Sequence, residues 1–187
     1  HRIASPRVDP WGLAVHPDRF EQHLEILRRT RHPLPMPEFV SRLERGTLPG
    51  NAVAVTFDDG YVDNLREASP RLASAQVPAT LFLATGFVGQ RYEYWWDELA
   101  RGILQGSGDV DAEVEIGPAR IPLMLRGGDE CDRGWRAWHE PRTSRQSTYL
   151  ALWKQLRTAA PAAREQAMVQ LRTELAMLPP SRADLPM

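Results

Sequence analysis

The chain has 187 residues, and its content of 42% hydrophobic and 25% charged residues allows a folded core and does not favour intrinsic disorder. Its 23 basic and 24 acidic residues leave a net charge of −1, so no overall field favours nucleic acid or an anionic membrane as a partner. The single cysteine, Cys131, excludes an intrachain disulfide and a cysteine-rich zinc module, and the longest apolar runs, such as residues 79–84, are too short to span a bilayer.

Two amphipathic helices are predicted in the first third of the chain. The first covers residues 17–29, where apolar side chains recur at spacings of four and three and so share one helical face. The second covers residues 37–45, and its side chains Phe39, Val40 and Leu43 are expected to face inward.

A strand–helix–strand unit is predicted next. The continuously apolar run 52–57 is typical of a strand buried on both faces, and it ends abruptly at Asp58-Asp59-Gly60. A helix is expected over residues 62–75, with Leu65 among the side chains that face the sheet, and a second buried strand over residues 78–84. Two strands joined by one helix within about thirty residues indicate parallel pairing and an α/β fold.

Residues 90–180 have a different character. The aromatic run 92–97 leads into a short helix, and residues 106–135 are rich in glycine and charge, with short alternating pieces. Two further helices are predicted over residues 149–157 and 162–178. We interpret the whole region as a mostly helical excursion from the α/β framework. The aromatic side chains suit stacking on sugar rings, although such a cluster more often forms core.

Asp58 and Asp59 are the strongest candidates for chemistry. They follow a buried parallel strand, which is where α/β folds bind their ligands. Two carboxylates this close resist ionising together unless a cation or strong donors are near. Adjacent residues do not suit a glycosidase pair, which needs carboxyls about 5–9 Å apart across a bond, whereas a metal-ligand carboxylate beside a general base is natural. The structural alternative is that both residues only end the strand and cap the next helix.

The motif Thr-Phe-Asp-Asp-Gly-Tyr at residues 56–61 resembles the polysaccharide deacetylases of carbohydrate esterase family 4. One branch of that family, often found with bacterial surface-polysaccharide genes, is similar over most of residues 1–100. The other matching segments are Asp63-Asn64, Pro70, residues 77–83, His1-Arg2-Ile3, Asp9-Pro10-Trp11, the predicted helix 17–29 and residues 94–99.

The resemblance implies a distorted (β/α) barrel, incomplete in this chain. We expect residues 1–89 to form the N-terminal part of the barrel and residues 90–180 to be a mostly helical insertion. Residues 181–187 would then return to a truncated barrel.

The resemblance also implies roles for four residues. Asp58 corresponds to the catalytic general base, and Asp59 to the aspartate that binds a divalent metal, most often zinc. Gly60 allows a close approach by the ligand, and the backbone N–H of Tyr61 corresponds to an oxyanion donor. The implied reaction is hydrolysis of N-acetyl groups on N-acetylhexosamine residues, such as N-acetylglucosamine, of a polysaccharide or oligosaccharide. His1 stands where the family has a histidine near the first strand, where it would either line the site or make a loop contact.

The chain departs from the family at the metal site. The family's other two ligands are a histidine pair spaced as His-x-x-x-His, and no such pair exists among His1, His16, His23, His32 and His139. A zinc site needs three protein ligands, so Asp59 cannot hold the ion alone. We therefore expect a longer protein with the histidine pair soon after Met187, and expect these residues by themselves to be inactive.

Two alternatives remain open at this stage. The first is a catalytically inactive relative that binds carbohydrate or serves as a scaffold. The second is an α/β domain in which Asp58 and Asp59 bind Mg²⁺ for phosphoryl transfer, but the chain lacks a glycine-rich phosphate loop.

Partners and location follow from the same arguments. A carbohydrate substrate is expected, with no nucleic acid and no transmembrane segment. Open strand edges in a partial barrel favour a homo-oligomer. A cytoplasmic location is favoured over a periplasmic or cell-envelope one.

Overall fold

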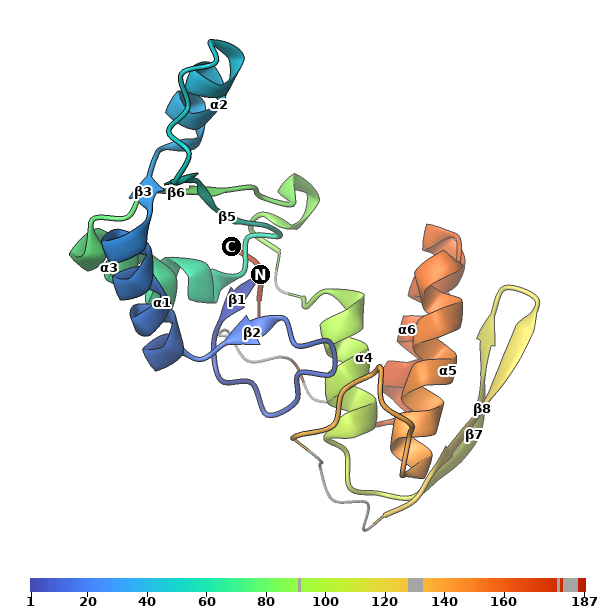
Figure 1. Ribbon diagram of the computed structural model, residues 1–187. Coiled ribbons are helices and arrows are strands. Elements are labelled where there is room, and N and C mark those ends of the chain that lie inside the picture. The colour runs from blue at the N-terminus through green and yellow to red at the C-terminus, as the bar shows by residue number, and fades with distance from the viewer. Residues whose placement is uncertain (91, 128–132, 178, 180–184) are drawn as a thin grey trace. The chain divides into compact units, whose positions relative to one another are not determined.

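A computed structural model describes residues 1–90, 92–127, 133–177, 179 and 185–187 (Figure 1), so Cys131 lies outside the described residues. The chain divides into two compact units. The first contains residues 1–6, 13–92 and 181–187, and the second contains residues 7–12 and 93–180, of which only the residues given above are described. Among those residues, no helix is long and apolar enough to cross a membrane.

The first unit is built from short parallel strand pairs and helices. Its elements are β1 (Arg2–Ile3), β2 (Ala14–Val15), α1 (Pro17–Thr30), β3 (His32–Pro33), α2 (Met36–Glu44), β4 (Ala52–Val53), β5 (Val55–Phe57), a π-helical turn (Asn64–Ala68), α3 (Ser69–Ala75), β6 (Ala79–Leu81) and a 3₁₀ turn (Thr85–Phe87). Strand β1 pairs with β2, β3 with β4 and β5 with β6, all in parallel. The parallel β5–β6 pair with its intervening helix confirms the α/β prediction.

Helix α1 forms where its apolar spacing predicts it. His16 precedes the helix, and its Nδ1 accepts a hydrogen bond from the backbone N–H of Asp18 at 3.2 Å, while Pro17 occupies the first turn. Phe20 and Leu24 are buried on the inner face. The Phe20 ring meets the Phe57 ring edge-on at 6.0 Å, so the helix packs against the residue that ends β5.

Several predictions of burial in this unit were wrong. Residues 52–57 form two short strands with different partners, and only Phe57 among them is buried. Strand β6 is shorter than predicted, and Phe82 and Leu83 beyond it are 51% and 46% exposed. The physical reason for this exposure is that each described sheet has only two strands. Each strand therefore pairs with another strand along one edge and has no strand along its other edge.

The helices of this unit also bury less than their patterns predict. No residue of α2 is buried, and Val40 and Leu43 are exposed rather than inward. The predicted helix 62–75 contains a π-helical turn, and its Leu65 is 58% exposed. Periodicity reports which face of a helix is apolar, and whether a neighbour covers that face depends on the tertiary structure.

The second unit combines three described helices with a β-hairpin. Its elements are α4 (Trp95–Leu104), β7 (Val110–Ile116), β8 (Ala119–Leu125), α5 (Ser144–Thr158) and α6 (Pro161–Glu174). Strands β7 and β8 are antiparallel, and Gly117 takes the positive φ of +58° that their tight turn requires. One face of the hairpin packs on α5 and α6, with Val114, Leu123 and Leu125 buried.

Residues 7–12 complete the core of this second unit. The indole Nε1 of Trp11 donates to the Tyr149 hydroxyl at 2.8 Å, and the Trp11 and Trp153 rings lie 4.3 Å apart. The backbone N–H of Ala137 donates to the carbonyl of Pro10 at 2.8 Å. A short segment from the start of the chain is therefore an integral part of the helical unit.

The aromatic run that precedes α4 contributes to packing. Tyr94 is buried and stacks on Trp96, with 4.5 Å between ring centroids and 6° between the ring planes. Trp95 packs against the core of the second unit. These contacts favour the core interpretation for Tyr94 and Trp95 over an exposed sugar platform.

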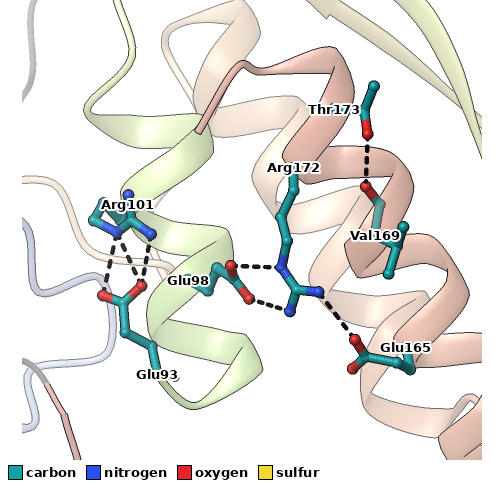
Figure 2. A network of polar contacts seen from close by, with 7 residues as sticks. All are labelled: Glu93, Glu98, Arg101, Glu165, Val169, Arg172 and Thr173. Atoms are coloured by element: carbon teal, nitrogen blue, oxygen red, sulfur yellow. Dashed lines mark hydrogen bonds and ion pairs between the residues drawn. The ribbon is translucent and has the colours of Figure 1, made fainter. Parts of the chain in front are cut away.

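An ion pair between Arg172 and Glu98 joins helices α6 and α4 of the second unit, and two further ion pairs lie close by (Figure 2). Arg172 on α6 donates through Nε and Nη2 to the two carboxylate oxygens of Glu98 on α4, at 2.8 Å each, and through Nη1 to Glu165 at 2.9 Å. Glu98 is 9% exposed and Glu165 66%, and hydrogen bonding to Glu98 above all raises the pKa of Arg172. Glu93 pairs with Arg101 at 2.8 Å.

Glu98→Gln is expected to lower the free energy of unfolding by about 1–3 kcal/mol, because Arg172 loses its charge-assisted hydrogen bonds to a buried carboxylate. Glu165→Gln makes the same chemical change on the exposed side of Arg172, and its expected cost is about 0–1 kcal/mol. Urea denaturation of the two variants and the wild type measures both values. Equal losses in the two variants would contradict the importance of the buried pair.

Candidate functional site

The Asp58-Asp59-Gly60 segment forms a tight, strained turn at the end of β5. The N–H of Gly60 donates to the carbonyl of Asp58 at 2.8 Å, which closes a three-residue γ-turn. Asp59 at its centre has a φ of +71°, and Gly60 follows with a φ of +78°. A non-glycine residue held at positive φ costs free energy, and such strain concentrates at functional sites.

The two carboxylates of the turn differ in their surroundings. Asp58 is exposed, whereas the Asp59 side chain is 30% exposed and its Oδ2 lies 2.8 Å from Nδ1 of His1. Partial burial, together with the charge of Asp58, raises the pKa of Asp59. The turn therefore presents one free carboxylate and one that already contacts an imidazole.

A buried ion pair fixes β1 beside this turn. Nε of Arg2 donates to Oδ2 of Asp63 at 2.8 Å, and the N–H of Ile3 donates to Oδ1 at 3.0 Å. The Arg2 guanidinium also lies 4.6 Å from the centre of the Tyr61 ring. Both charged side chains are less than a tenth exposed. Because His1 directly precedes Arg2, these contacts place its imidazole next to Asp59.

The last described residues pair with the segment that follows the turn. Met187 donates its backbone N–H to the carbonyl of Gly60 at 2.8 Å, and Val62 donates to the carbonyl of Leu185 at 3.1 Å. Tyr61 is fully buried and forms an antiparallel bridge with Pro186. Residues 185–187 therefore run alongside the predicted oxyanion segment, Gly60 and Tyr61.

Comparison with known families identifies the segment that contains the Asp58–Asp59 turn. Residues 45–114 match the family model described as polysaccharide deacetylase, and the match includes the Asp58–Asp59 turn. This segment is polysaccharide deacetylase-like. A solved structure of a de-N-acetylase from Aggregatibacter actinomycetemcomitans is similar to the chain, with 16% sequence identity, a TM-score of 0.42 and coverage of 89% of this chain and 70% of that one. No curated protein matches the sequence.

The donors of the deacetylase-like segment can be tested against the metal that the family implies. Nδ1 of His1 and Oδ2 of Asp59 lie together, with Asp58 adjacent in sequence. Within the described ranges, no group of three His, Cys, Asp or Glu side chains is placed to hold an ion. A zinc site requires three protein ligands, so the described residues do not complete one.

Gly60→Ala in the deacetylase-like turn is expected to lower the free energy of unfolding by about 1–3 kcal/mol, because alanine disfavours positive φ. An added Cβ would also lie 2.7 Å from a terminal methyl of Leu83, a flexible side chain that can move. Gly46 has a φ of +67° and open space around it, so Gly46→Ala is the matched control for backbone strain alone. Denaturant unfolding of both variants tests this, and a smaller loss for Gly60→Ala than for Gly46→Ala would contradict it.

The structure places the predicted site residues in one segment and brings further side chains next to them. Asp58 and Asp59 were predicted as a pair, and the structure places both in one turn. His1, for which the sequence allowed either a place in the site or a loop contact, contacts Asp59. Arg2 and Asp63 were not predicted as part of the site, and their signal in the sequence is that each stands in a segment that carries the family resemblance, His1-Arg2-Ile3 and Asp63-Asn64.

Proposed function

We propose that the protein is a metal-dependent hydrolase that removes N-acetyl groups from N-acetylhexosamine residues of a polysaccharide or oligosaccharide. The observation that carries the proposal is the family match over residues 45–114, which includes the Asp58–Asp59 turn. The strained γ-turn and the His1 contact support it, because they describe a carboxylate held in a costly conformation beside a second metal-binding side chain.

The proposal gives each carboxylate one task. Asp58 is exposed to solvent and would act as the general base that takes a proton from the attacking water. Asp59 would bind the divalent metal, with zinc as the first choice, together with donors from outside the described residues. Gly60 and the N–H of Tyr61 would line the side of the site where the oxyanion forms. The overall reaction adds one water to an acetamido group and releases acetate and an amine.

A deacetylase-type (β/α) barrel with an insertion at residues 90–180 is part of this proposal. The barrel portions would be residues 1–89 and 181–187. Support comes from the three described strand pairs of the first unit, since all of them are parallel as in such a barrel.

Acetate release tests the proposed activity. The full-length natural protein is incubated with N-acetylglucosamine oligomers and Zn²⁺, and acetate and free amine are measured over time. Equal amounts of the two products, both abolished by a chelator, are the expected result. Zinc content is measured in parallel, and about one equivalent per chain is expected. Oligomer binding without acetate release and without zinc would overturn the proposal and favour the inactive carbohydrate-binding or scaffolding alternative.

A further inference from the structure

Asn64 has a buried side-chain amide that lacks a hydrogen-bond partner among the described residues. The residue is 5% exposed, and both its Oδ1 and its Nδ2 are sealed from solvent and unpaired. Its backbone N–H is satisfied by the carbonyl of Tyr61 at 3.0 Å, so only the side chain is unpaired. Because native proteins pair nearly all buried polar groups, an amide with both ends unpaired needs an explanation.

The local backbone around Asn64 is also unusual. Asn64 begins the π-helical turn Asn64–Ala68, which closes with the N–H of Ser69 donating to the Asn64 carbonyl. Single π turns are rare and occur frequently at functional sites. The backbone irregularity and the unpaired amide therefore coincide at one residue.

Asn64 lines a cavity of about 270 Å³ in the first unit. Phe57, Leu72 and Leu81 contribute apolar walls, and Ser69 and Thr80 contribute hydroxyl groups. Among the described residues that line it, none carries an ionisable side chain. Burying a charged ligand beside such walls would be costly, so the cavity suits a small uncharged molecule with a polar group.

We propose that this cavity binds an uncharged secondary amide. An amide carries one carbonyl and one N–H, which match the unpaired Nδ2 donor and Oδ1 acceptor of Asn64. Its apolar substituents would contact Phe57 and the two leucines. Because both amide atoms are sealed from solvent, binding would require the Asn64 side chain to rotate toward the cavity. The secondary amide comes either from an acetamido sugar or from a short peptide, and the site does not depend on the proposed catalytic role of Asp58 and Asp59.

Selective labelling of asparagine allows a direct test. The chain has two asparagines, and Asn51 lies exposed in a turn, so its side-chain NH₂ signals serve as an internal control for Asn64. Protein labelled with ¹⁵N-asparagine is titrated with N-methylacetamide as the minimal probe. We expect the Asn64 NH₂ signals to shift with a dissociation constant on the order of 1–10 mM, and the Asn51 signals to stay in place.

Two further probes identify the source of the amide. N-acetylglucosamine supplies the acetamido group of a sugar, and N-acetylalanine methylamide supplies the amide of a peptide. The probe that binds with the lower dissociation constant identifies which of the two is the natural ligand class. Glucose, which has no amide, should produce no shift.

Asn64→Leu keeps the volume of the side chain and removes its polar atoms. In this variant, binding is followed by the resonances of Leu72 and Leu81. The affinity for N-methylacetamide should fall at least about tenfold, which corresponds to 1.4 kcal/mol, so these resonances should no longer respond at the same probe concentrations. Absence of any shift at Asn64 with all three amide probes, or unchanged binding in Asn64→Leu, would overturn the proposal. Loss of acetate release in the catalytic assay would not affect either result.

Discussion

Asp58→Asn is expected to reduce the rate of deacetylation about 10²–10⁴-fold, the range that a positioned general base contributes. Asparagine has nearly the same shape but cannot accept a proton from water at neutral pH. The side chain is exposed, so the substitution should leave the fold intact. Acetate release under saturating substrate measures the rate, and circular dichroism checks the fold.

Two variants separate the roles of the adjacent carboxylates. Asp58→Asn should retain bound zinc, whereas Asp59→Asn should lose both zinc and activity. Asp111→Asn changes an exposed aspartate on β7 and is the control that should retain full activity. Substantial turnover by Asp58→Asn would show that another group takes the proton.

Asp63→Ala is expected to lower the free energy of unfolding by about 3–5 kcal/mol, because it leaves the buried Arg2 guanidinium without its negative partner. The Ile3 N–H loses its acceptor in the same variant. Urea denaturation measures the loss. Glu38→Ala breaks the ion pair with Arg42 on α2, where both side chains are more than a third exposed, and should cost about 0–0.5 kcal/mol.

A double variant shows why Asp63→Ala loses stability. The loss comes either from the missing attraction between the two charges or from the Arg2 charge that is left buried without a partner. Arg2→Met combined with Asp63→Leu removes both charges, and we expect it to recover most of the stability lost in Asp63→Ala. If the double variant is as unstable as the single one, the ion pair itself holds β1 in place.

The Asp63 pair also predicts a pH dependence. Burial raises the pKa of Asp63 above the ordinary 3.8, although Arg2 and the Ile3 N–H act in the opposite direction. A raised pKa in the folded state means that the protonated carboxyl favours folding. This contribution is complete below about pH 3.8 and disappears as the pH rises through the folded-state value. The stability of wild type relative to Asp63→Asn should therefore increase as the solution is acidified toward pH 4.

The sequence allowed prediction of those features that are set by local patterns. Helix α1 was expected over residues 17–29 and covers Pro17–Thr30, because its apolar spacing lies within the segment itself. The parallel pairing of β5 with β6 also followed from local signals, namely two apolar runs separated by one helix.

Features that depend on distant partners could not be predicted in the same way. Arg2 and Asp63 lie 61 residues apart, and no spacing rule relates a charge in the first strand to one that directly precedes the π-helical turn Asn64–Ala68. The positive φ of Asp59 depends on the hydrogen bonds around the turn rather than on its residue type. Exposure of Phe82 and Leu65 depends on whether another element covers them.

The contribution of residues 7–12 to the second unit has a consequence for the evolution of this protein. Trp11 is held by Tyr149 and Trp153, and Pro10 by Ala137, so the helical unit is completed by a loop from the opposite end of the sequence. Recombination that replaced residues 93–180 alone would leave Trp11 without its partners and the helices without part of their core. We therefore expect homologues that differ in the helical region to differ in the Asp9-Pro10-Trp11 loop as well.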